Sequence, residues 1–249
     1  MPLKSFADGR LFGERYGSGG NRVVALHGWG RDRRDFVGVL GGLDAVALDL
    51  PGFGASPAPV DPLGAAGYAN TLAPWIGSLG EPQVLVGHSF GGRVATVLAA
   101  ERRELVAGLV LVAVPLVRPA DSVVRKVPVG YRLIRWGNRV GLLSGDHLER
   151  AKRGRGSADY RMASGVMRDI LVKVVNESYE SELARLKCPV RLVWGADDRE
   201  VPLDVADRSV DLLDDARLGD VGLEVIPDCG HDVPGVAPDR IRKAIEDLL

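Results

Sequence analysis

Six short runs of apolar residues recur along the chain, and they constrain the fold more than any other feature of the sequence. They are apolar at nearly every position instead of alternating with polar residues. Strands have this composition when they lie in a parallel sheet that is covered on both faces. The runs span residues 22–28, 45–52, 83–89, 105–115, 190–195 and 222–228. We therefore expect these segments to form the core strands of an α/β protein.

Helical patterns lie between several of these strands, over residues 64–79, 91–103, 204–213 and 237–248. Pro238, near the start of the last one, suits the first turn of a helix. The opening residues predict a small hairpin with Asp8 and Gly9 at its turn. A chain of 249 residues, 46% of them hydrophobic, is long enough for one domain with a sizeable core. The prediction is a mainly parallel sheet of seven or eight strands with helices on both faces.

Residues 118–182 interrupt this alternation. They contain no convincing core strand and several amphipathic stretches, with 13 lysines and arginines against 8 aspartates and glutamates. An excursion of this length is too long for an ordinary strand-to-helix connection. We expect it to be an inserted helical cap, with residues 1–117 and 183–249 forming the core.

The composition predicts a cytoplasmic protein without cofactor, metal, nucleic-acid or membrane partner. The net charge is −1, which gives no global field for nucleic acid. The two cysteines, Cys188 and Cys229, form no CxxC pair, and no Gly-x-Gly-x-x-Gly follows a strand. The first residues contain no apolar signal region, and the longest apolar run, 109–117, is too short to span a bilayer.

A single serine, Ser89, stands between glycines where a predicted strand passes into a predicted helix. In Gly87-His88-Ser89-Phe90-Gly91 the glycines allow a sharp turn without Cβ clashes. Such a turn exposes the serine hydroxyl and points the first N–H groups of the helix at it. The pattern indicates a nucleophile, although a plain glycine turn would have the same letters.

A serine nucleophile needs a base, and the base needs a carboxylate to orient it. Of the four histidines, His231 follows the last predicted strand in a loop that can reach back to Ser89. The stretch "VWGADDREVP" after the strand at 190–195 supplies the carboxylate. Taken alone, these two pieces would be an ordinary loop histidine and a solvated acidic turn. All three pieces, however, follow the carboxyl ends of predicted parallel strands, where sites form in open α/β sheets.

The chain resembles the α/β-hydrolase-fold proteins over nearly its whole length. The matching pieces are "LHGWG" (26–30), "DLPGFGAS" (49–56), "GHSFGG" (87–92), "GADDREVP" (195–202) and "CGH" (229–231). The order nucleophile, acid, histidine is that of this family. The resemblance implies a catalytic triad of Ser89, Asp198 and His231, with Asp198 preferred over Asp197 by the family's Gly-x-x-Asp-x-x-Val-Pro pattern.

Two backbone N–H groups are the candidates for an oxyanion hole, which stabilises the negative charge of a tetrahedral intermediate. Phe90 is next to the nucleophile, and Trp29 lies in the loop after the first long strand. His27 is then expected to be structural. His88 is expected to be buried beside the turn, where it packs or makes a hydrogen bond.

A triad with serine favours acyl transfer to water, hence a serine hydrolase that cleaves a small-molecule ester or related acyl bond. Two alternatives keep the triad: a carbon–carbon bond hydrolase, and a lyase similar to that of the menaquinone pathway, which the "SFGGR" turn and the basic cap faintly resemble. A third is a non-catalytic ligand-binding module on a hydrolase scaffold.

The predicted cap should set specificity, because proteins that share a fold differ in what their sites admit. Tyr131, Arg132, Arg135 and Trp136 are the candidates for binding substrate, within a mixed pocket to which Tyr160, Met162 and Met167 are also expected to contribute. Arg132, Arg135 and Arg139 would share one face of a helix. That face could guide an anionic substrate or simply be solvated.

Overall fold

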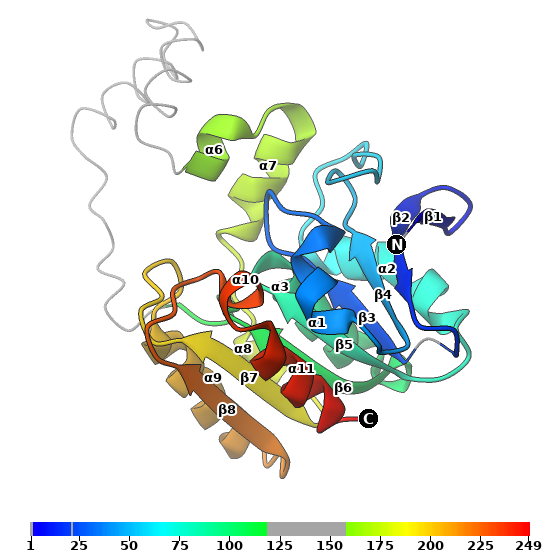
Figure 1. Ribbon diagram of the computed structural model, residues 1–249. Helices are drawn as coiled ribbons and strands as arrows, with labels where there is room; N and C mark the ends of the chain where they lie inside the picture. The colour runs from blue at the N-terminus through cyan, green and yellow to red at the C-terminus, as the bar shows by residue number, and fades with distance from the viewer. Residues whose placement is uncertain (1, 21, 119–157) are drawn as a thin grey trace, which may run out of the picture.

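The computed structural model describes residues 2–20, 22–118 and 158–249. One sheet of eight strands runs through the molecule in the order β1-β2-β4-β3-β5-β6-β7-β8 (Figure 1). The strands are β1 (Leu3–Phe6), β2 (Leu11–Tyr16), β3 (Val23–Leu26), β4 (Ala45–Asp49), β5 (Gln83–His88), β6 (Val106–Val112), β7 (Val190–Gly195) and β8 (Val221–Ile226). Strands β3 to β8 pair in parallel, and β1 and β2 form an antiparallel edge. The expected fold class, strand number and opening hairpin are confirmed.

Side chains from alternate positions of the parallel strands enter two separate cores. Val24 and Leu26 of β3 belong to one core, and Val23 and Ala25 belong to the other. All four are fully buried. This two-sided burial explains why the strands are apolar at nearly every position.

Helices cover both faces of the sheet. On one face lie α2 (Ala65–Gly77), α3 (Phe90–Glu101) and α9 (Leu203–Asp215); on the other lie α1 (Val37–Leu40) and α11 (Pro238–Glu246) (Figure 1). α11 begins at Pro238 and buries Ile241, Ala244 and Ile245 at helical spacing. The four expected helices are therefore present. Four short elements of the described residues were not predicted: α1, the 3₁₀ turn Arg33–Phe36 before it, the 3₁₀ turn Arg103–Leu105 after α3, and α10 (Val233–Val236).

The described part of the expected cap contains α6 (Ala158–Met162), α7 (Gly165–Val174) and α8 (Glu180–Leu183). Figure 1 shows α6 and α7 beside the loops that follow β3 and β4. α7 buries Ile170 and Val174 in the same core as α2 and α3. The Tyr179 N–H donates to the Leu116 carbonyl at 2.8 Å, so the chain re-enters the core beside the point where it left. The division into core and cap stays a prediction.

Half-buried Arg93 connects α3 to the end of α7. Its guanidinium donates to the Val174 carbonyl and lies over the Tyr179 ring, 5.8 Å from the ring centroid. Glu177 accepts from the Tyr179 hydroxyl at 2.8 Å and from the Ala65 N–H at 3.1 Å. These contacts fix α7 against the helix that begins after Ser89. Among the described helices, none has the length and apolar character needed to cross a membrane.

Candidate active site

Ser89 occupies a strained turn between β5 and α3. Its φ of 48° and ψ of −110° lie in a region that residues with a Cβ rarely adopt. The turn is held by the Ser89 N–H, which donates to the Val112 carbonyl at 2.9 Å, and by the Gly91 N–H, which donates to the His27 carbonyl at 3.0 Å. A Cβ at Gly91 would lie 2.1 Å from the Leu26 carbonyl oxygen. The glycine is thus required, and the expected strand–turn–helix context of Ser89 is present.

Asp198 and His231 form a hydrogen-bonded pair at the carboxyl ends of β7 and β8. Nδ1 of His231 lies 2.8 Å from Oδ2 of Asp198. The other oxygen, Oδ1, accepts from the N–H groups of Glu200 and Val201, each at 2.9 Å. The Asp198 side chain is fully buried, whereas the neighbouring Asp197 is exposed. Of the two aspartates, Asp198 is the one in contact with His231.

These hydrogen bonds fix the proton on the His231 ring. The Asp198 carboxylate only accepts, so Nδ1 carries the hydrogen and Nε2 is free to accept a proton. Nε2 lies 3.9 Å from Oε2 of Glu200, a carboxylate that is 72% exposed. Within the described ranges, no hydrogen bond joins the Ser89 hydroxyl to the imidazole. The His231 backbone, however, contacts His88, the residue before Ser89, at 3.0 Å.

Two other histidines near Ser89 are buried and neutral. His27 donates from Nδ1 to the Gly28 carbonyl at 2.7 Å and accepts at Nε2 from the Leu50 N–H at 2.9 Å, which ties the end of β3 to the end of β4. Burial lowers the pKa of His27 to about 4 and that of His88 to about 3. The buried hydrogen bond expected for His88 is confirmed, and the structural role of His27 stays a prediction that these contacts support.

Trp29 and Phe90, the candidate oxyanion donors, lie together beside Ser89. Their rings pack edge to face with centroids 5.4 Å apart, and Phe53 packs on Trp29 at 5.0 Å. Among the described residues, the Trp29 N–H donates to no backbone carbonyl. The N–H of Phe90, the first residue of α3, donates to no backbone carbonyl outside that helix. Gly30 has a φ of +71°, which turns the chain after Trp29.

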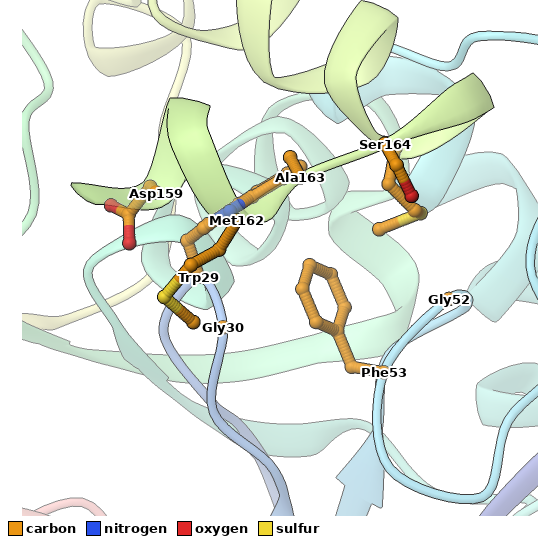
Figure 2. A pocket seen from close by; sticks show the side chains of 9 residues that line it. Trp29, Gly30, Gly52, Phe53, Asp159, Met162, Ala163 and Ser164 are labelled. Carbon is orange, nitrogen blue, oxygen red and sulfur yellow. The ribbon is translucent and has the colours of Figure 1, made fainter. Parts of the chain in front are cut away.

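A cavity of about 230 Å³ adjoins Trp29 (Figure 2). One wall comes from the loops after β3 and β4, and the other comes from α6, α7 and the residues between them. It is mainly apolar, with one carboxylate, and is lined by Trp29, Gly30, Gly52, Phe53, Asp159, Met162, Ala163, Ser164 and Met167. Met162 and Met167 were expected to contribute to a pocket, and both line this one. Tyr131, Arg132, Arg135, Trp136 and Arg139 lie outside the described residues.

The turn at residues 49–56 was expected to stabilise the floor of the site, but the sequence did not single out Phe53, Asp159, Ala163 or Ser164 in the cavity wall, or the partners of Asp49. The buried Asp49 carboxylate accepts from the Arg33 N–H and guanidinium and from the Ala55 N–H, at 2.8–2.9 Å. A Cβ at Gly54 would lie 2.3 Å from this carboxylate. The charge within the apolar run 45–52 was a signal for this role, because a buried aspartate at the end of a strand needs partners.

Nothing in the described ranges forms a group of three or more side chains able to hold a metal ion. The chemistry that the described residues support is proton transfer at Nε2 of His231. The Ser89 hydroxyl lies on the adjoining turn, directly before Phe90 at the start of α3.

Comparison with known proteins agrees with the fold described above. The model of the alpha/beta hydrolase family matches residues 23–244. Lipase LipV of Mycobacterium tuberculosis is 33% identical over 95% of this chain and 96% of its own length. The uncharacterized hydrolase YugF of Bacillus subtilis is 26% identical over 100% of this chain and 98% of its own. The crystal structure of a membrane phospholipase A, a bacterial virulence factor, shares the fold, with a TM-score of 0.71 and 23% identity over 99% of this chain and 84% of that one.

Proposed function

The chain belongs to the alpha/beta hydrolase family and is a hydrolase, and we propose that it is a serine hydrolase that cleaves a small-molecule ester through an acyl-enzyme intermediate. The observation that carries this proposal is the Asp198–His231 hydrogen bond of 2.8 Å beside the strained turn of Ser89. The printed names of the relatives, which include a lipase, support the choice of an ester.

In the first half of the proposed reaction, Nε2 of His231 takes the Ser89 proton while Oγ attacks the ester carbonyl carbon. The carbonyl oxygen becomes an oxyanion and accepts from the N–H groups of Trp29 and Phe90. Asp198 stabilises the imidazolium and keeps its Nδ1 hydrogen in place. The imidazolium then gives its proton to the leaving alkoxide, and an alcohol departs.

In the second half, His231 takes a proton from a water molecule, whose oxygen attacks the acyl carbon. The same two N–H groups stabilise the second oxyanion. The Ser89 oxygen then leaves and recovers the proton from His231, which releases a carboxylic acid and restores the enzyme. A serine–histidine hydrogen bond is often loose before substrate binds, so the geometry at Ser89 is compatible with this cycle.

The cavity next to Trp29 is the proposed site for the acyl group. Its walls from Phe53, Met162 and Met167 are apolar, and it adjoins the candidate oxyanion donor. Its volume of about 230 Å³ is below the roughly 300–1,000 Å³ of sites for drug-sized ligands. We therefore expect short acyl chains to react faster than long ones.

The test is a series of p-nitrophenyl esters of increasing acyl length, with mass spectrometry of the protein after a fluorophosphonate probe. We expect turnover that is highest at short chains, and one adduct, on Ser89. Ser89→Ala should fold, lose the adduct and lose roughly 10³-fold or more in kcat, because triad members act as a unit. An adduct at another residue, or an active Ser89→Ala, would refute the assignment.

Assays with further substrates, run beside the ester series, separate the alternatives. Pyruvate release without ester turnover would indicate a lyase, and cleavage of a carbon–carbon bond in place of the ester would indicate the corresponding hydrolase. No turnover of any substrate, together with specific binding, would indicate a ligand-binding module.

A further inference from the structure

His88 contacts the loop that carries His231. It is the last residue of β5, directly before Ser89, and only 1% of it is exposed. Its Nε2 lies 3.0 Å from the carbonyl oxygen of His231, and the two rings have centroids 5.0 Å apart. A carbonyl oxygen only accepts, so Nε2 of His88 carries the hydrogen and donates it.

The opposite side of the His88 ring meets the turn that carries Trp29. A Cβ added to Gly28 would lie 2.8 Å from Nδ1 of His88, so the glycine allows the ring to sit against the backbone there. With the hydrogen on Nε2, Nδ1 of the neutral ring is an acceptor, and it has no hydrogen-bond partner among the described residues. Oδ2 of Asp35 is 3.9 Å away. A buried polar atom without a partner is costly, which suggests that the ring is kept for its Nε2 contact.

Arg31 makes a second connection, between the loop after β3 and the loop that carries His231. Its guanidinium contacts Asp35 at 2.5 Å and Asp232, the residue after His231, at 2.8 Å. Asp232 is half exposed and Arg31 is 36% exposed, so this ion pair is screened by water and contributes little. The buried His88 hydrogen bond is the stronger of the two restraints on the backbone at His231.

We infer that His88 is a positioning residue: its Nε2–H holds the His231 backbone in register with the Ser89 turn and the Gly28–Trp29 turn. This inference rests on the proposed function, in which His231 exchanges protons with Ser89. One imidazole then touches all three loops that must be aligned for the reaction. A displacement of about 1 Å between reacting groups can cost on the order of 10²-fold in rate.

The experiment compares three variants. His88→Leu keeps an apolar side chain in the space but removes the donor. His88→Gln restores an N–H donor near the position of Nε2. Thr96→Val is the matched control, because the buried Thr96 hydroxyl donates to the Gly92 carbonyl within α3 at 2.8 Å, so its hydrogen bond stays inside one helix.

We measure kcat and KM on a short p-nitrophenyl ester, the rate of fluorophosphonate labelling of Ser89, and the thermal midpoint. For His88→Leu we expect kcat and the labelling rate to fall roughly 10- to 100-fold with KM within about twofold. His88→Gln should recover most of this loss. Thr96→Val should keep the wild-type kcat even if its midpoint falls as far as that of His88→Leu.

Amide hydrogen exchange in residues 229–236 gives a readout that does not depend on activity. It should accelerate in His88→Leu and remain near wild type in His88→Gln and Thr96→Val. Equal kcat and equal exchange in His88→Leu and Thr96→Val would overturn the inference, as would a His88→Gln no better than His88→Leu. If wild-type Ser89 is unreactive, the proposed function fails, and the exchange data still decide whether His88 positions the loop.

Discussion

The backbone at Ser89 stores strain that a serine hydrolase would keep for exposing its nucleophile. With a φ of 48°, such a position costs on the order of 1–3 kcal/mol for a residue with a Cβ. Ser89→Gly removes the Cβ, at an entropy cost of roughly 0.5–1 kcal/mol. We expect Ser89→Gly to be about 1 kcal/mol more stable than Ser89→Ala, with both inactive, by urea denaturation. Equal stability of the two variants would show that the turn is not strained.

The hydrogen bonds of Asp198 make a specific prediction for its amide variant, Asp198→Asn. Oδ1 already accepts two N–H groups, from Glu200 and Val201. The substituted side chain would therefore place its amide oxygen there and turn its NH₂ toward His231, which makes Nδ1 an acceptor and puts the hydrogen on Nε2. His231 could then no longer take the Ser89 proton. We expect Asp198→Asn to fold and to lose roughly 10³- to 10⁴-fold in kcat.

Asp197→Asn is the matched control for that measurement. Asp197 is the adjacent residue and carries the same charge, but its side chain is exposed. The kcat of Asp197→Asn should stay within about twofold of wild type, because an exposed charge contributes little. A large loss in Asp197→Asn with a small one in Asp198→Asn would exchange the roles of the two residues.

At the scale of elements, the cavity wall formed by α7 predicts a change in acyl specificity. Met167 is half-buried and faces the turn after β4, where a Cβ on Gly52 would meet its sulfur. Met167→Ala would enlarge the cavity, and we expect kcat/KM to rise several-fold for longer acyl chains relative to short ones. One buried methylene is worth about 0.8 kcal/mol, or about fourfold.

Met162→Ala is the control for the cavity, since Met162 lines it from the rim and is 79% exposed. Its chain-length profile should stay close to wild type. A profile that shifts equally in both variants would place the acyl group outside the part of the cavity next to Gly52.

The elements that the sequence predicted well are those with strong local signals. The inner core strands are apolar at nearly every position because both faces are buried, and Pro238 marks the start of α11. α1 and α10 were missed because each has only four residues, too few to show a period. The Ser89 turn was predictable because glycines are sterically required there. The hydrogen-bond partners of Asp49 and His88 were not, because these partners, such as Arg33 and His231, are distant in sequence.

At the scale of the whole molecule, the two buried histidines predict how stability depends on pH. The pKa of His27 is lowered to about 4 and that of His88 to about 3, both mainly by burial, whereas an unfolded histidine has a pKa of about 6.5. Between these values the unfolded chain binds more protons than the folded one. The free energy of unfolding therefore falls as pH drops below about 6.5, by up to about 1.4 kcal/mol per pH unit for each histidine.

Urea denaturation at pH 7, 6 and 5 measures this slope. His27→Gln and His88→Gln should each lower the pH dependence of the free energy of unfolding, by the amount that corresponds to about one fewer proton taken up on unfolding. This holds even if both variants are less stable than wild type at every pH. Burial raises the pKa of Asp35, which adds a contribution of opposite sign, but one that the variants share with wild type. An unchanged slope in either variant would mean that its histidine is charged in the folded protein.

The hydrogen bond between the Tyr179 N–H and the Leu116 carbonyl also bears on how such a protein can diversify. It brings together two points of the core that are far apart in sequence. Those parts of an intervening segment that do not pack into the core, as α7 does, can be lengthened or shortened at little cost in stability, because closing a longer loop adds only about 0.6 kcal/mol per doubling. Recombination at this junction could therefore graft another protein's segment onto an unchanged Ser89, Asp198 and His231. New substrate ranges would then arise, by evolution or by engineering, through exchange of the segment between Leu116 and Tyr179.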